Sequence, residues 1–242
     1  MTGAELRPAW RRGGWLASRP VKRLLARPLA VVGGLIVIAF VAMAVAAPWL
    51  APYDPAAPDF LSVRQPPSAE YLLGTDEIGR DLLSRVIYGA RASLIAGVIS
   101  VAIAMLAGVP LGLLAGFYGG WLDEAIMRVT DALLSFPFLI LAVALAAALG
   151  PSLENAMIAI GIAVTPTFVR LTRGQVLSVK AAEYVQAARA LGAGDGRILA
   201  WHVLPNAFAP ILVQATVTIA QAIIAESSLS FLGLGVQPPT PS

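Results

Sequence analysis

The chain has 242 residues, of which 58% are hydrophobic and 13% are charged, with a formal net charge of +3 and a mean hydropathy of +0.78. A soluble domain of this length needs more polar surface than these residues supply, so ordinary soluble and disordered proteins are excluded. The absence of cysteine excludes thiolate zinc sites and cysteine nucleophiles. The single histidine, His202, argues against a multi-histidine metal site or a Ser-His-Asp hydrolase.

Charged residues are clustered along the chain, and long apolar runs separate the clusters. A helix needs about 20 apolar residues to cross a hydrocarbon layer about 30 Å thick. Non-helical backbone would leave N–H and C=O groups unpaired in lipid. We therefore predict an all-α, polytopic membrane protein with five transmembrane helices, near residues 29–49, 92–118, 132–150, 153–171 and 205–230.

The first predicted span, 29–49, follows a basic N-terminal segment of residues 1–28. Lys and Arg also outnumber acids in residues 170–204, whereas acids outnumber arginines in residues 50–91. Basic loops remain in the cytoplasm, so the N-terminus and 170–204 are expected there and 50–91 outside. Ala44-Val45-Ala46 resembles a signal-peptidase site, but the apolar run is longer than a signal core, so we prefer an uncleaved helix.

The predicted outer loop, 50–91, is rich in proline at first and amphipathic over residues 80–91. The amphipathic stretch predicts a short helix on the outer membrane surface, and its alternative is the polar start of the next span. Asp76, Glu77 and Asp81 lack the spacing of a calcium-binding loop. We interpret these acids as a solvated cap or a receptor-facing surface.

The second predicted span, 92–118, carries small residues at every fourth position. Such a stripe lets another helix approach closely. We predict a packing seam within the chain, with a dimerisation face as the alternative. Prolines within the predicted spans are expected to kink a helix or mark its end. The stripe comprises Ser100, Ala104, Gly108, Gly112, Gly116 and Gly120, and the prolines are Pro110, Pro137, Pro166 and Pro210.

The fourth predicted span, 153–171, has the shortest uncharged run. It crosses the bilayer only if it tilts little and Arg170 and Arg173 extend toward the interface. A re-entrant or buried soluble helix is the alternative. A topology without this span would place the second basic loop, 170–204, outside the cell. The positive-inside rule therefore favours a topology that includes the span.

The sequence of the loop 172–205 predicts two short helices that project into the cytoplasm. The first contains good helix formers and ends at Gly192, in the position of a C′ glycine. The second is amphipathic and is expected to stop at Pro205. Exposed charged and apolar groups on such a pair suit docking onto a soluble partner.

This loop resembles the E-A-A-x3-G-x9-I-x-L-P pattern of the permease subunits of bacterial ABC importers. Gln186-Ala187-Ala188, Gly192 and Leu204-Pro205 lie at the spacing of this pattern. Two positions depart from it, since Gln186 replaces glutamate and His202 replaces isoleucine. The surrounding sequence is similar to the oligopeptide and dipeptide permease C-type branch, which includes nickel and glutathione permeases. Further similar stretches lie at 73–81, 127–137, 184–192, 202–206 and 226–239.

The resemblance implies a type I importer permease in the bacterial cytoplasmic membrane. Its implied partners are a second permease, two cytoplasmic ATPase subunits that hold ATP and Mg, and an extracytoplasmic substrate-binding protein. The chain has no phosphate-binding loop and is not expected to be an enzyme or to hold a cofactor or metal. Residues 92–232 correspond to the permease core. The tail, 233–242, ends before a helix usual in the family, so we expect a truncated product.

The resemblance also implies which residues contact the ATPase, since the helix pair 183–205 corresponds to the coupling helix. These residues are Tyr184, Gln186, Ala187, Ala188, Arg189, Gly192, His202, Leu204 and Pro205.

Other candidate residues lie in the spans. Glu226 falls inside an apolar run, so Glu226, Ser227 and Ser230 are candidates for the translocation path, with a structural hydrogen bond as the alternative. Arg128 and Asp131 are candidates for a structural or gating ion pair across one helical turn.

Two other functional classes compete with the ABC permease. A stand-alone secondary carrier driven by an ion gradient is the main alternative, but the sequence shows no convincing internal repeat. An intramembrane enzyme lacks a suitable set of catalytic groups. The sequence does not identify the solute.

Overall fold

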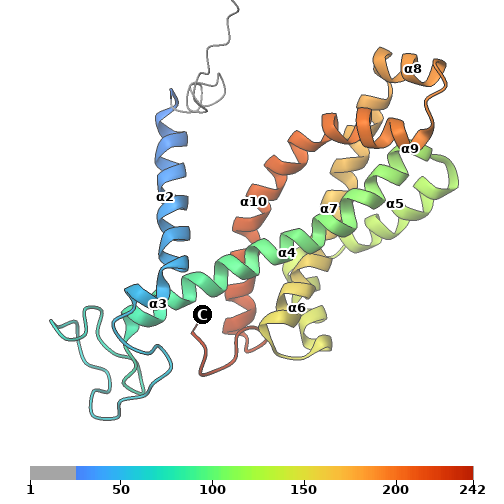
Figure 1. Cartoon of the computed structure of the whole chain (residues 1–242). Helices are drawn as coiled ribbons and strands as arrows, with labels where there is room; N and C mark the ends of the chain where they lie inside the picture. The colour runs from blue at the N-terminus through green and yellow to red at the C-terminus, as the bar shows by residue number, and fades with distance from the viewer. Residues whose placement is uncertain (1–25, 242) are drawn as a thin grey trace, which may run out of the picture.

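The computed structural model describes residues 26–241, and these residues form helices and loops without a strand (Figure 1). The predicted all-α membrane architecture is confirmed. In the described part of the chain, four helical stretches are long and apolar enough to cross a membrane, and a bent helix pair brings the number to five. Most of the predicted basic segment 1–28 lies outside the described residues.

The first span is α2 (Pro28–Val45), followed by the short helix α3 (Ala47–Leu50). The expected helix 29–49 is thus divided at Ala46, and Pro48 lies in the first turn of α3. A proline is tolerated there because its missing N–H has no acceptor in the first turn. Helix α2 is largely exposed and stands beside the bundle, near the first part of α4 (Figure 1).

The second span, α4 (Leu82–Tyr118), begins ten residues earlier than expected. The prediction of a separate surface helix over 80–91 is wrong, because that stretch is the start of α4. Asp81 sets this start: its carboxylate accepts a hydrogen bond from the Ser84 backbone N–H at 2.8 Å, as an N-cap residue does. The preceding residues, 51–81, form a non-helical segment that we call the outer segment.

The third predicted span, 132–150, is not one helix. The structure has α5 (Gly120–Leu134) and α6 (Phe138–Leu149), which meet at an angle of 93°. Pro137 lies at the break with an extended backbone, since it cannot donate a hydrogen bond to continue α5. Neither helix alone is long enough to count as a span, but the pair carries the chain back across the bundle (Figure 1).

Helix α7 (Leu153–Lys180) is the central helix of the bundle and packs on α4, α6 and α10. It extends nine residues beyond the predicted end at residue 171. Most of its apolar window is buried, although it is the least apolar of the candidate spans. Burial among other helices explains that weak signal, because a helix shielded from lipid does not need an apolar surface all round.

The small-residue stripe of α4 forms the seam with α7, as predicted. A Cβ atom added at Gly108, Gly112 or Gly116 would lie 2.7, 2.6 or 2.8 Å from side-chain atoms of α7. Only glycine therefore permits this approach. Gly120 does not belong to the seam, since it starts α5 with a φ of 59° and has open space around it.

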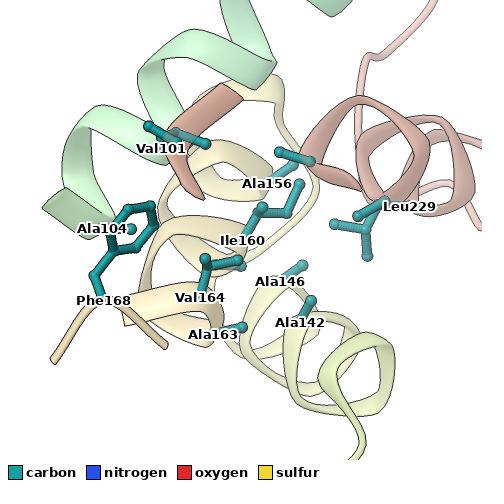
Figure 2. Close-up of a cluster of buried hydrophobic side chains, with 14 of the residues drawn as sticks. Val101, Ala104, Ala142, Ala146, Ala156, Ile160, Ala163, Val164, Phe168 and Leu229 are labelled. Carbon is teal, nitrogen blue, oxygen red and sulfur yellow. The ribbon is translucent and has the colours of Figure 1, made fainter. Parts of the chain in front are cut away.

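The core lies mainly between α4, α6, α7 and α10. Figure 2 shows Ala142 and Ala146 of α6 opposite Ile160 and Val164 of α7. The small alanine side chains of α6 thus leave room for the branched side chains of α7. This packing holds the short helix α6 against the central helix.

The last helices are α8 (Glu183–Ala190), α9 (Asp195–Ile198), a π-helical turn η2 (Leu199–Val203) and α10 (Leu204–Phe231). The expected stop at Pro205 is wrong. Pro205 lies in the first turn of α10, and the wider π turn precedes it. In Figure 1, α8, α9 and the start of α2 lie at the upper end, whereas the outer segment lies at the lower end.

Candidate functional site

Residues 183–203, which we call the α8–α9 segment, are fastened to the ends of α4 and α7 by apolar contacts. Phe117 at the end of α4 and Val176 of α7 form a buried cluster with three side chains of the segment. Those three are Val185, Ile198 and Val203. All five side chains are almost completely buried, so α8 and α9 are packed directly on two long helices.

Phe117 also connects the segment through polar contacts. The Lys180 ammonium donates a hydrogen bond to the Phe117 carbonyl oxygen, an acceptor at the α4 C-terminus. The same ammonium lies 5.6 Å from the centroid of the Phe117 ring, and the Arg189 guanidinium lies 5.4 Å from it. Both distances are within the range of cation–π attraction. Side chains of α7 and α8 therefore both lie against one aromatic ring of α4.

The turn between α8 and α9 depends on Gly192, whose φ is 83°. The Ala193 N–H donates to the Ala188 carbonyl and the Gly192 N–H donates to the Arg189 carbonyl, each at 3.0 Å. These two bonds define a Schellman motif and agree with the predicted C′ glycine. The charged groups of Arg189 and Asp195 also approach to 3.6 Å across the turn.

The outer surface of the α8–α9 segment carries large apolar side chains. Leu191 is 88% exposed, Trp201 is 76% exposed and Tyr184 is 46% exposed. The sequence analysis did not select Leu191 or Trp201, although large apolar residues in a polar loop were an available signal. Of the other selected residues, Gln186, Ala187, Arg189, Gly192 and Pro205 are exposed, and Ala188, His202 and Leu204 are half-buried.

Two ion pairs join α5 to α7. Asp123 accepts two hydrogen bonds from the Arg173 guanidinium, at 2.5 and 2.6 Å, and Asp131 accepts one from Arg170 at 2.5 Å. The predicted Arg128–Asp131 pair is not formed, because Arg170 of the neighbouring helix occupies the Asp131 carboxylate. Arg170 and Arg173 thus bind acids on α5, whereas the sequence suggested that they extend toward the membrane interface.

A cavity of about 400 Å³ opens between the α5–α6 pair and helices α7 and α10. Leu, Phe, Ala, Val and Ile side chains make up most of its wall. The polar part of its lining comes from α7 and α10, and none of these residues was selected from the sequence. They are Thr167, Thr218, Gln221 and Ser228.

Glu226 is completely buried near the end of α10. Its carboxylate accepts hydrogen bonds from the Ser230 hydroxyl at 2.7 Å and the Ser93 hydroxyl of α4 at 3.5 Å. Ser230 also accepts a bond from the Val236 N–H at 3.0 Å. These contacts match the structural alternative for Glu226. Ser227 is exposed and is not one of the residues that bond to Glu226 in the described part of the chain.

Comparison with known proteins places these features in a family. Residues 108–242 match the family described as binding-protein-dependent transport system inner membrane component. Residues 17–67 match the N-terminal transmembrane domain of oligopeptide transport permease C. The chain belongs to the permease subunits of binding-protein-dependent ABC importers, and within them to the C-type subunits of the peptide branch.

The curated relatives agree with this assignment over most of their length. A di/tripeptide transport system permease protein of Pseudomonas aeruginosa is 51% identical over 218 residues, which cover 86% of this chain and 71% of that protein. A dipeptide permease protein of Alkalihalophilus pseudofirmus is 46% identical, covering 91% and 72%. A glutathione permease protein of Pectobacterium atrosepticum is 42% identical, covering 96% and 82%.

Two solved structures have a similar fold. Both are inward-facing forms of the MetNI methionine ABC transporter, with TM-scores of 0.56 and 0.58. They are 21% and 20% identical to this chain, and the matches cover 63% and 64% of it and 76% and 77% of those chains. At this identity the likeness concerns the fold alone.

Proposed function

We propose that the chain forms half of a translocation path for peptides or a related small solute and couples that path to ATP hydrolysis by partner subunits. Relatives that are 42–51% identical are named for dipeptide, tripeptide and glutathione transport. The proposed partners are a second permease, two ATPase subunits that bind ATP and Mg, and an extracytoplasmic binding protein. The membrane is the bacterial cytoplasmic membrane, with the N-terminus in the cytoplasm.

The observation that carries this proposal is the attachment of the α8–α9 segment. One side of the segment is buried against Phe117 and Val176, and the other presents Leu191 and Trp201. An exposed apolar surface next to charged groups suits a protein interface. Motion of a docked ATPase would move α4 and α7 as rigid bodies, because the buried cluster leaves little room for the segment to slip.

The cavity between the α5–α6 pair, α7 and α10 is the proposed contribution of this chain to the path. Its wall is mostly apolar, with amide and hydroxyl groups from Gln221, Thr167 and Ser228. Such a lining can accept a polar backbone without fixing it by charge. Glu226 remains a candidate only if the partner permease or a second conformation exposes it, since it is buried in this chain.

Reconstitution distinguishes this proposal from a stand-alone carrier. Proteoliposomes that contain the chain, its partner permease and the ATPase subunits are expected to take up labelled dialanine only with ATP and the binding protein. Proteoliposomes that contain the chain alone are expected to show no uptake in a proton or sodium gradient. Gradient-driven uptake by the chain alone would contradict the proposal.

A further inference from the structure

The outer segment contains a small pocket with an acidic wall. Its volume is about 210 Å³, below the roughly 300–1,000 Å³ typical of pockets for small-molecule ligands. The pocket therefore suits one side-chain end or a small ion better than a whole solute. Its charged and aromatic lining consists of Tyr53, Asp54, Asp59, Tyr71 and Asp81.

Apart from Glu70, the acids of the outer segment fall into two groups. Asp76 is paired with Arg80 at 2.7 Å and Glu77 with Arg64 at 2.8 Å, and neither acid lines the pocket. The three pocket acids, Asp54, Asp59 and Asp81, form no ion pair with the residues that the structure describes. Three acids without an ion pair therefore lie together at the pocket.

The two carboxylate oxygens of Asp81 differ in their hydrogen bonding. The residue is only 3% exposed, and its Oδ2 atom is occupied by the backbone and hydroxyl groups of Ser84, at 2.8 and 2.6 Å. Its Oδ1 atom is buried and has no hydrogen-bond partner within the described part of the chain. A buried carboxylate oxygen without a donor is costly, so a donor placed in the pocket would be favoured.

The pocket also has an aromatic wall. The rings of Tyr53 and Tyr71 lie with centroids 5.2 Å apart, and the Tyr53 hydroxyl donates to the Glu70 carbonyl oxygen at 3.2 Å. Burial raises the pKa of Tyr53, and the negative charges of Glu70 and Asp81 contribute, so the phenol stays neutral. Neutral tyrosine rings beside carboxylates are typical surroundings for an organic cation.

We propose that this pocket receives a lysine or arginine side chain of the extracytoplasmic binding protein when that protein docks. The identity of the partner rests on the proposed function. A guanidinium or ammonium group would pair with Asp59 while its stem contacts the tyrosine rings, and a local opening around the buried Asp81 Oδ1 would let the same group donate to it. A metal ion is disfavoured, since the described residues contain no group of three His, Cys, Asp or Glu side chains arranged to hold one.

The direct test of the pocket uses a probe that does not involve the binding protein. A fluorophore attached at Ala57→Cys, in a chain that has no other cysteine, would report binding of methylguanidinium to the importer in nanodiscs. Saturable binding is expected with millimolar methylguanidinium and not with sodium chloride at equal ionic strength. Asp59→Asn should abolish it, whereas Glu77→Gln, which removes a charge outside the pocket, should not. Equal responses in both variants would overturn the proposal.

Docking is then measured with the binding protein and the assembled importer. Asp54→Asn and Asp59→Asn keep an oxygen for the Ala56 and Leu61 N–H groups, so local folding is preserved. Each should weaken binding about 10-fold, and Glu77→Gln less than about 2-fold, since paired interface charges matter more than peripheral ones. Unchanged affinity in both pocket variants would overturn the docking role. Failure of the wild-type importer to bind any binding protein would instead refute the proposed function.

Discussion

The α8–α9 segment and the outer segment lie at opposite ends of the described structure and are held in different ways (Figure 1). The α8–α9 segment is fixed by a buried apolar cluster around Phe117, whereas the outer segment is fixed by hydrogen bonds and by ion pairs such as Arg80–Asp76. Apolar packing resists displacement in every direction, while individual polar contacts can be exchanged one at a time. The first arrangement suits transmission of force, and the second suits recognition of a partner.

Removal of the Phe117 side chain should have the largest effect on transport, because it takes away the centre of the apolar cluster. Phe117→Ala takes away the ring shared by α4, α7 and α8, and such a core truncation costs about 3–5 kcal/mol. We expect transport and binding-protein-stimulated ATP hydrolysis to fall at least about 10-fold, the ratio that about 1.4 kcal/mol represents. Both rates are measured in proteoliposomes. Trp121→Ala is the control, because Trp121 is an exposed aromatic residue close along the chain that does not belong to the cluster, and an equal loss there would refute the role of the cluster.

Substitution of Gly192 tests whether coupling depends on the turn between α8 and α9 as well as on the apolar cluster. Gly192→Ala must adopt a φ of 83°, which costs an L-residue about 1–2 kcal/mol. We expect partial loss of coupling, measured as transport per ATP hydrolysed. Gly194→Ala is a matched control, since Gly194 has a φ of −68° and open space around its Cβ position. Similar losses in both variants would show that the turn geometry is not the cause.

The two ion pairs between α5 and α7 show how much polar contacts stabilise the helices near the α8–α9 segment, for comparison with its apolar contacts. Asp123 holds Arg173 with two bonds in a half-buried place, whereas the Asp131–Arg170 pair is more exposed. Asp123→Asn should lower the thermal midpoint of the purified protein more than Asp131→Asn, whose exposed pair contributes about 0–1 kcal/mol. Calorimetry in detergent measures this order. A larger effect at Asp131 would contradict the assigned geometry.

Acid should loosen the outer segment while leaving the Phe117 cluster intact. Burial opposes ionisation of Asp76, but hydrogen bonds from the Arg80 and Ile78 backbone and the Arg80 guanidinium outweigh it, so the Asp76 pKa is lowered from 3.8. A lowered pKa means that this stabilisation is complete above 3.8 and is lost as the pH falls through the folded-state value. A fluorophore at Ala57→Cys should report this small transition. The Asp59 pKa is also lowered, by hydrogen bonds from Ser62 and Leu61, so the transition should become smaller in Asp76→Asn and disappear only when Asp59→Asn is added. A transition of unchanged size in Asp76→Asn would contradict the role of Asp76.

Sequence patterns identified the features that depend on neighbouring residues along the chain. The glycine stripe, the C′ glycine at 192 and the apolar spans all have a local signature, and each appears in the structure. The break at Pro137 was harder to place, because a proline within an apolar run fits either a kink or an end. Features that join distant residues had no such signature. Asp131 binds Arg170 across two helices, and the cavity wall combines α6, α7 and α10.

Cross-linking from Leu191 tests the central claim most directly. The chain has no cysteine, so Leu191→Cys places one thiol at the most exposed apolar point of the α8–α9 segment. Leu61→Cys provides an equally exposed thiol in the outer segment. In intact membranes that contain the whole importer, a short thiol cross-linker is expected to join position 191 to the ATPase subunit and position 61 to the binding protein. Attachment of position 191 to the binding protein, or its labelling from the cell exterior, would contradict the account.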